Sequence, residues 1–358
     1  MRILIAGACG FVGLTIAKYL SGAFAGCGNQ FELTGVDNLS REGSEHNRRA
    51  LIDSGAEFIH ADLRMASDLE SFPEVDWVID AAAKPSVLAG VNGTSSRQLV
   101  QHNLDSTINL LEYCKKNHSG FVLLSTSRVY SIEELCSIPV LQHNDGFRIN
   151  TFEKLPYGVS AQGVSEDFSV RPPVSLYGTS KLASEQFALE YGSTFDFPVW
   201  INRCGILAGA GQFGRIDQGI LSYWIDAYYH RKALDYIGFE GRGLQTRDCL
   251  HPHDLASLLV KQIQDSGDAS RRVFNVGGGK SHSFSLAQLS QWCEARFGPH
   301  EVGSDPNPRR FDIPWMIMDA TRASERWGWQ PEIEREAVFN EIAEKSLQTP
   351  IRLEVKSA

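Results

Sequence analysis

The chain has 358 residues, of which 42% are hydrophobic and 22% charged, so it can bury a large core and form two domains or one enlarged domain. Its formal net charge of -9 excludes a global basic field and argues against nucleic acid as a partner. Local arginines remain compatible with a phosphorylated small molecule.

Seven scattered cysteines, an odd number without a C-x-x-C pair, indicate reduced thiols and no zinc site. The run His251-Pro-His253 suits the start of a helix better than a metal site, so we expect no metal. No apolar run reaches the length of a membrane span, and the first apolar run leads directly into a glycine turn, unlike a signal peptide. We therefore expect a cytoplasmic protein that does not act at a membrane.

The first strand-like run, residues 2–6, ends in a glycine turn that is followed at once by helical spacing. Glycines let the backbone approach a pyrophosphate closely, and the helix N-terminus offers it free N–H groups. The order of strand, turn and helix therefore predicts a dinucleotide site. The expected contacts in this turn are Gly7, Gly10, Phe11, Val12 and Gly13.

Three further expected strands end in residues suited to the same cofactor. The strand 31–36 ends at Asp37, whose carboxylate can bind a ribose and repel a 2′-phosphate, which favours NAD over NADP, although Arg41 keeps NADP open. The strands 57–60 and 75–80 should end at the same edge of a parallel sheet. The cofactor contacts expected at these ends are Asp37, Asn38, Asp62, Leu63, Ala81, Ala82, Ala83 and Lys84.

Tyr177 and Lys181 stand four residues apart at the start of an expected helix, 177–191, so both project from one face. A nearby positive charge favours the phenolate and lowers the pKa of a tyrosine from its usual value of about 10. Tyr177 is then a candidate general base. The spacing also arises by chance, so its meaning depends on the other motifs. Thr126, at the end of the strand 121–126, is placed to hydrogen-bond the group that Tyr177 attacks.

The alternation of strands and helices predicts a Rossmann-like, doubly wound parallel α/β sheet over residues 1–203, to which residues 246–277 cross back. A smaller mixed α/β substrate domain should follow over 204–358. Residues 131–174 read as an irregular flap or insertion, and 332–356 as a charged helix and tail that lie mostly on the surface.

Together these motifs resemble the extended short-chain dehydrogenase/reductases of the NAD-dependent epimerase/dehydratase family, which act on nucleotide sugars. The resemblance covers the chain to about Pro331, and the segments 125–130 and 211–219 look most like the CDP-paratose 2-epimerases (CDP-tyvelose epimerases). The motifs are Gly7-x-x-Gly10-x-x-Gly13, Asn103-x-x-x-Thr107, Ser125-Thr126-x-x-Val129-Tyr130, Pro173-x-Ser-x-Tyr177-Gly-x-Ser-Lys181, Arg247-Asp248-x-Leu-His251-x-x-Asp254 and Trp327-Gly-Trp329-x-Pro331.

The resemblance implies that Tyr177 is the catalytic base, that Lys181 holds the nicotinamide ribose and that Thr126 binds the sugar hydroxyl. It implies tightly bound NAD, with Asn103 and Ser125 among its contacts, and a nucleotide-diphosphate sugar as the ligand. It also implies a homodimer formed through helices 98–117 and 177–191. The residues expected at the substrate are Thr126, Ser127, Arg203, Gln218, Arg247 and Arg310.

The implied reaction is epimerisation, in which the sugar is oxidised to a transient keto sugar and reduced again on its opposite face. The inverted carbon, C2 or C4, stays open. The 4,6-dehydratases carry an Asp-Glu pair after their threonine, and Ser127 and Arg128 stand there instead, so dehydration is not expected. A net NAD-dependent reductase and a non-catalytic NAD-sensing regulator remain as alternatives, although a regulator would not need Tyr177, Lys181 and Thr126.

Overall fold

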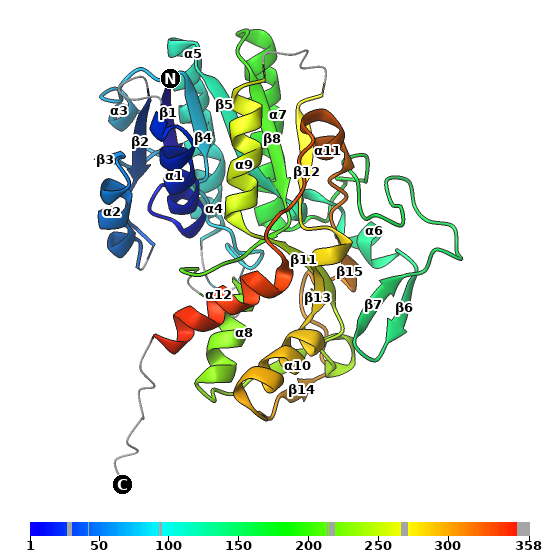
Figure 1. Ribbon diagram of the computed structural model, residues 1–358. Helices are drawn as coiled ribbons and strands as arrows, with labels where there is room; N and C mark the ends of the chain where they lie inside the picture. Colours follow the sequence, from blue (N-terminus) through cyan, green and yellow to red (C-terminus); the bar gives the residue numbers. More distant parts are fainter. Residues whose placement is uncertain are drawn as a thin grey trace.

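The computed structural model describes residues 1–26, 31–41, 43–91, 93, 95–212, 214, 219–265 and 271–348. Its largest unit is a seven-stranded sheet made of β1 (Arg2–Ala6), β2 (Glu32–Asp37), β3 (Glu57–His60), β4 (Trp77–Asp80), β5 (Gly120–Thr126), β8 (Val199–Cys204) and β12 (Val273–Val276). The strand order is β12-β8-β5-β4-β1-β2-β3, and every neighbouring pair is parallel (Figure 1). The predicted Rossmann-like sheet is confirmed.

Helices cover both faces of this sheet, and the sequence of β1 explains why they can. Successive side chains of a strand point to opposite faces, so Ile3 and Ile5 join one buried cluster while Leu4 and Ala6 join the other. A strand buried on both faces is therefore apolar throughout. The first cluster contains residues of α1 (Phe11–Ala23), α2 (Ser44–Asp53), α9 (Pro252–Ile263) and α11 (Thr321–Trp327). The second contains residues of α3 (Ala66–Leu69), α5 (Ser106–Asn117) and α7 (Ser175–Thr194).

The helix expected over residues 98–117 is not a regular α-helix throughout. It consists of α4 (Ser96–Val100), a wider π turn over Gln101–Asp105, and α5. Asn103 lies in the π turn and is buried. Its Oδ1 atom accepts a hydrogen bond from the backbone N–H of Lys84 at 2.8 Å, and its amide nitrogen donates to the Ser180 hydroxyl at 3.0 Å. Asn103 therefore joins the segment after β4 to α7.

The rest of the chain builds a second part around β11 (Thr246–Leu250), which pairs with β13 (Ser283–Ser285), β15 (Trp315–Met316) and β9 (Ile206–Leu207). Residues 246–277 supply β11 to this smaller sheet, α9 to the face of the large sheet, and β12 to its edge. The remaining elements of this part are α8 (Ile220–Tyr229), α10 (Leu286–Phe297), α12 (Arg335–Leu347) and the strand pair β10 (Asp235–Ile237) with β14 (Gly303–Asp305).

Two segments that were expected to be irregular or mostly exposed contain regular or buried structure. The insertion 131–174 contains α6 (Ile132–Cys136) and a hairpin of β6 (Val140–His143) with β7 (Gly146–Ile149), and it contributes to a buried cluster with β15. The helix α12 has one buried face, because its apolar stripe packs into the same cluster as α8 and α10. The buried residues of that stripe are Val338, Phe339, Ile342 and Ala343.

Among the described residues, none of the helices combines the length and the apolar content that crossing a bilayer requires.

A buried ion pair connects the central strands to α7. The Arg203 guanidinium, on β8, donates to both carboxylate oxygens of Glu185, on α7, at 2.7 to 3.1 Å. The Ser125 hydroxyl, on β5, donates to the same carboxylate. Both charged side chains are almost completely buried, so each depends on the other for compensation.

We expect Glu185→Gln to lower the free energy of unfolding by about 3–5 kcal/mol, because it leaves the Arg203 charge buried without its partner. The matched control is Arg49→Gln, which breaks the exposed pair between Arg49 and Asp53 on α2 and should change stability by less than about 0.5 kcal/mol. Chemical denaturation measures both. Equal losses in the two variants would contradict the importance of the buried pair.

Candidate active site

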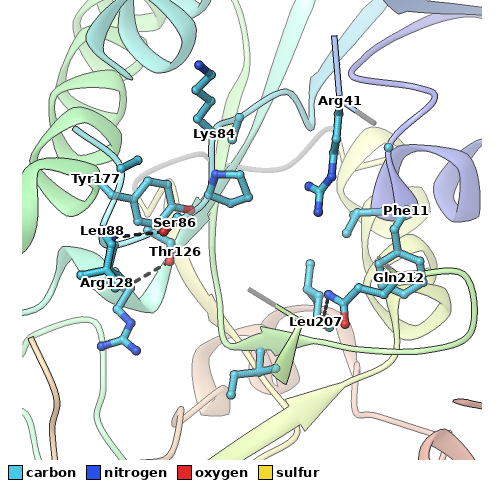
Figure 2. Close-up of a pocket in the computed structure, with 18 of the residues that line it drawn as sticks. Phe11, Arg41, Lys84, Ser86, Leu88, Thr126, Arg128, Tyr177, Leu207 and Gln212 are labelled. Carbon is cyan, nitrogen blue, oxygen red and sulfur yellow. Dashed lines mark hydrogen bonds between the residues drawn. The ribbon is translucent and has the colours of Figure 1, made fainter. Parts of the chain in front are cut away.

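A cavity of about 1120 Å³ lies where the carboxyl ends of the parallel strands face the second part of the chain (Figure 2). This is the place where open parallel sheets bind their ligands, because the loops that follow the strands diverge there. Most of the predicted cofactor residues line it. They are Gly7, Gly10, Phe11, Val12, Gly13, Asp37, Asn38, Asp62, Leu63, Ala81, Ala82, Ala83, Lys84 and Ser125.

The glycine turn leaves no room for side chains. Gly7 has a φ of +74°, and a Cβ atom there would lie 2.8 Å from the Ala82 Cα atom. A Cβ atom on Gly13 would lie 2.2 Å from the Gly7 carbonyl oxygen. The first turn of α1 begins directly after Gly10, where the amide groups have no intrahelical partners. The turn therefore presents bare backbone and a helix N-terminus to the cavity, which is the environment that a pyrophosphate requires.

Two carboxylates follow β2 and β3 at the same end of the cavity. Asp37 accepts hydrogen bonds from the backbone N–H groups of Leu39, at 2.8 Å, and Cys9, at 3.0 Å, while burial raises its pKa above the usual value. Asp62 accepts hydrogen bonds from the Arg64 side chain, which lower the pKa of Asp62 to about 2. Asp37 is thus held in one orientation by the backbone, with its carboxylate at the cavity wall.

Tyr177 and Thr126 are both buried and both line the cavity, next to each other (Figure 2). Burial raises the pKa of Tyr177 to about 12, and a hydrogen bond with Thr126 and the positive charge of Arg128 oppose that increase. The expectation that Lys181 brings the pKa of Tyr177 toward neutrality is therefore corrected. The desolvation of the phenol outweighs the effect of the cations around it.

Lys181 lies one helical turn beyond Tyr177 and is 1% exposed. Burial lowers its pKa, and the carboxylates of Asp80 and Glu185 act in the opposite direction. Its Nζ atom has no hydrogen-bond partner among the described residues. A buried ammonium without a partner is costly, so this group fits a site where a ligand supplies the acceptors.

Three predicted site residues are not among those that line the cavity, and a fourth, Gln218, lies outside the described residues. Asn103 and Lys181 are buried. Arg203, expected at the substrate, is instead paired with Glu185 inside the fold. A signal for this partner was present, because Glu185 stands four residues after Lys181 and shares its face of α7.

The part of the cavity wall that the second part of the chain contributes carries arginines. Arg247 and Arg310 line the cavity as predicted, together with Ser127. The Arg247 guanidinium donates to the Asp312 carboxylate at 3.3 Å and to the Ile313 carbonyl at 2.7 Å, and burial lowers its pKa to about 10. This wall offers a ligand a place for negative charge.

Sequence reasoning missed several residues that line the cavity. Arg309 stands directly before Arg310, and Arg128 occupies the place of an acidic residue in the dehydratases, so both had a signal. Gln212 had none. Its side chain is oriented by a hydrogen bond to the Leu207 carbonyl at 2.9 Å (Figure 2).

Comparison with known proteins identifies the family of the chain. The model of the NAD dependent epimerase/dehydratase family matches residues 3–277. CDP-paratose 2-epimerase of Salmonella typhi is 25% identical over 346 residues, which cover 93% of this chain and 95% of the relative. UDP-glucose 4-epimerase of Mycolicibacterium smegmatis is 26% identical over 345 residues, covering 93% and 94% of the two chains.

The fold is found in solved structures as well. The crystal structure of UDP-glucuronic acid 4-epimerase from Bacillus cereus, in complex with UDP-glucuronic acid and NAD, matches with a TM-score of 0.77 at 24% identity. The match covers 97% of this chain and 99% of the other. The resemblance found in the motifs is confirmed. Since the family model extends over most of the sequence, the chain belongs to the NAD-dependent epimerase/dehydratase family.

Proposed function

We propose that the chain is an NAD-dependent nucleotide-sugar epimerase, which oxidises one sugar carbon to a ketone and reduces it again on the opposite face. The observation that carries the proposal is one cavity that is lined by Tyr177 and Thr126, by the glycine turn and by several arginines. A CDP-paratose-like sugar inverted at C2 is the first choice, because both the motifs and a relative of 25% identity favour it. Inversion at C4 is the other outcome.

NAD is the cofactor of this family, and the described residues fit it. The turn at Gly7 and Gly13, where a Cβ atom would collide with backbone, suits the pyrophosphate. Asp37 suits the adenosine ribose, and the buried Nζ atom of Lys181 suits the hydroxyls of the nicotinamide ribose. When bound in this way, NAD would supply the redox chemistry, as acceptor and donor of a hydride. We propose that NAD stays bound through the whole cycle.

The residues of the chain carry the proton. In the proposed mechanism Tyr177, as phenolate, removes the proton of the sugar hydroxyl while the carbon is oxidised, and it returns that proton when the ketone is reduced. Thr126 hydrogen-bonds the same hydroxyl and the phenol. Ser127 and Arg128 provide no carboxyl group beside Thr126, so the site lacks the acid/base pair with which a dehydratase expels water.

We further propose a homodimer formed through the α4 to α5 segment and α7, which expose Val100, Leu176 and Phe187 at 41 to 45% of their surface. Light scattering should give about twice the monomer mass of 39.7 kDa. Phe187→Glu should produce monomers, because it places a charge in the apolar contact. Phe152→Glu, at a phenylalanine that is 94% exposed elsewhere, should not. A monomeric wild type would exclude this interface.

Gly13→Ala should abolish NAD binding or weaken it at least about tenfold, because its Cβ atom would lie 2.2 Å from the Gly7 carbonyl oxygen and displace the turn. The matched control is Gly22→Ala in the same helix, where a Cβ atom meets nothing within 4 Å. It should bind NAD normally and gain up to about 1 kcal/mol of stability. Calorimetric titration with NAD compares the two, and normal binding by Gly13→Ala would contradict the assignment of the turn.

The proposed reaction is tested by incubating the protein with CDP-, UDP-, GDP- and dTDP-sugars in deuterated buffer and reading the stereochemistry of the products by NMR. We expect one sugar centre to invert without net formation or consumption of NADH. Consumption of added NADH in proportion to the product would instead identify a net reductase.

Tyr177→Phe should lower kcat by about 10²- to 10⁴-fold, whereas Tyr191→Phe, on the same helix outside the cavity, should leave it unchanged. The pKa of Tyr177 is raised to about 12, so the deprotonated base becomes more abundant, and the rate higher, as pH increases from 6 to 9. In Thr126→Ala the loss of the hydrogen bond that lowers this pKa should move the increase to higher pH. A pH-independent wild-type rate would contradict Tyr177 as the base.

A further inference from the structure

Arg128 lies in the cavity, but neither the motifs nor the proposed mechanism gives it a positive role. It follows Thr126 by two residues, in a 3-10 turn over Ser127–Val129. The Thr126 hydroxyl accepts a hydrogen bond from the backbone N–H of Arg128 at 3.2 Å (Figure 2). The backbone of Arg128 is therefore attached to the residue that faces the reacting hydroxyl in the proposed mechanism.

The same backbone is also pressed against α7. A Cβ atom on Gly178 would lie 2.2 Å from the Arg128 carbonyl oxygen, so the turn and the helix can approach this closely only because residue 178 is a glycine. Gly178 directly follows Tyr177. The backbone position of Arg128 is thus fixed with respect to both Thr126 and Tyr177.

The Arg128 guanidinium points away from Thr126 and Tyr177 (Figure 2). It donates to the Phe311 carbonyl at 3.3 Å. The next residue of that segment, Asp312, accepts a hydrogen bond from Arg247. The guanidinium groups of Arg128 and Arg247 therefore donate to two consecutive residues. Burial lowers the pKa of Arg247, and the nearby positive charge of Arg128 acts in the same direction.

The described residues of this region include more guanidinium groups than carboxylates. Four arginines line it, and Asp235 and Asp312 are the described carboxylates that the second part of the chain contributes to the cavity. Asp312 already accepts from Arg247, from the Gln245 side chain and from a backbone N–H. The carbonyl that Arg128 contacts carries no net charge, and a guanidinium has five donors to satisfy. An anion with several acceptor oxygens would compensate the excess. The four arginines are Arg128, Arg247, Arg309 and Arg310.

We propose that Arg128 binds the sugar-proximal phosphate of the nucleoside-diphosphate sugar. This inference rests on the proposed function. Among these arginines, Arg128 is the one whose backbone is hydrogen-bonded to Thr126 and packed against Gly178, the residue after Tyr177. In the proposal it therefore binds the phosphate next to the reacting sugar, and Arg247 binds the other phosphate. A fixed phosphate gives the keto sugar a pivot, about which it can turn its opposite face to the cofactor.

The test uses protein saturated with NAD and measures the binding of CMP, CDP, UMP and UDP by calorimetric titration. The wild type should bind a nucleoside diphosphate more tightly than the matching monophosphate. Arg128→Gln should weaken diphosphate binding about 10- to 100-fold, as expected for a lost hydrogen-bonded charge, and change monophosphate binding less than about threefold. Arg128→Lys should restore part of the difference. Arg148→Gln, at an exposed arginine of the β6–β7 hairpin, should behave as the wild type.

Each other outcome overturns the inference in a distinct way. If Arg128→Gln binds the diphosphate as the wild type does, the guanidinium does not contact that phosphate. The same titrations are made with UDP-glucose and UDP-glucuronate. If Arg128→Gln weakens the binding of UDP-glucuronate but not that of UDP-glucose, Arg128 recognises a carboxylate on the sugar. If monophosphate and diphosphate binding fall equally, with the same loss of melting temperature in Arg128→Lys, its role is structural. A wild type that binds none of the nucleotides would overturn the proposed function as well.

Discussion

The buried ion pair between Glu185 and Arg203 is the interaction on which the site geometry depends. It joins α7, which carries Tyr177, to β8, and through the Ser125 hydroxyl it reaches β5, which ends at Thr126. The tyrosine and the threonine come from elements that are far apart in the chain, so their proximity has to be produced by packing. A charged pair inside the protein is satisfied in few arrangements, which favours a single relative position of the helix and the strands.

The parts of the fold that follow from local rules could be predicted from the sequence. The parallel sheet, the glycine turn and the polar strand ends depend on hydrophobic periodicity and on backbone geometry, both of which neighbouring residues determine. In agreement with these rules, Gly7, Gly10, Gly13, Asp37 and Thr126 all line the cavity at the carboxyl ends of the strands.

The rest depends on contacts between distant residues. Arg203 was expected at the substrate because an arginine at the end of a strand can bind either a ligand or a carboxylate of the protein. Its partner, Glu185, lies on another element, so the sequence did not distinguish the two roles. The pKa of Tyr177 depends on burial as much as on the nearby cation, and spacing along a helix does not report burial. The apolar stripe of α12 was hidden among charged residues, and only packing against α8 and α10 makes it part of a core.

The charge of the molecule is distributed in a way that matters for specificity. The chain is acidic as a whole, with a net charge of -9, yet arginines are concentrated inside one cavity. An acidic exterior disfavours polyanions, which would have to approach the whole surface, while a small anion that enters the cavity meets the local positive field. The shape of the protein thus selects by size among ligands of the same charge.

The π turn over Gln101–Asp105 has a consequence for how this chain can change. An α-helix advances about 100° per residue, so the wider turn resets the orientation between α4 and α5. Removing one residue there would restore regular hydrogen bonding but rotate Asn103 away from the Lys84 backbone and from Ser180. The helix that borders the cavity therefore tolerates exchange of its exposed side chains more readily than a change in its length.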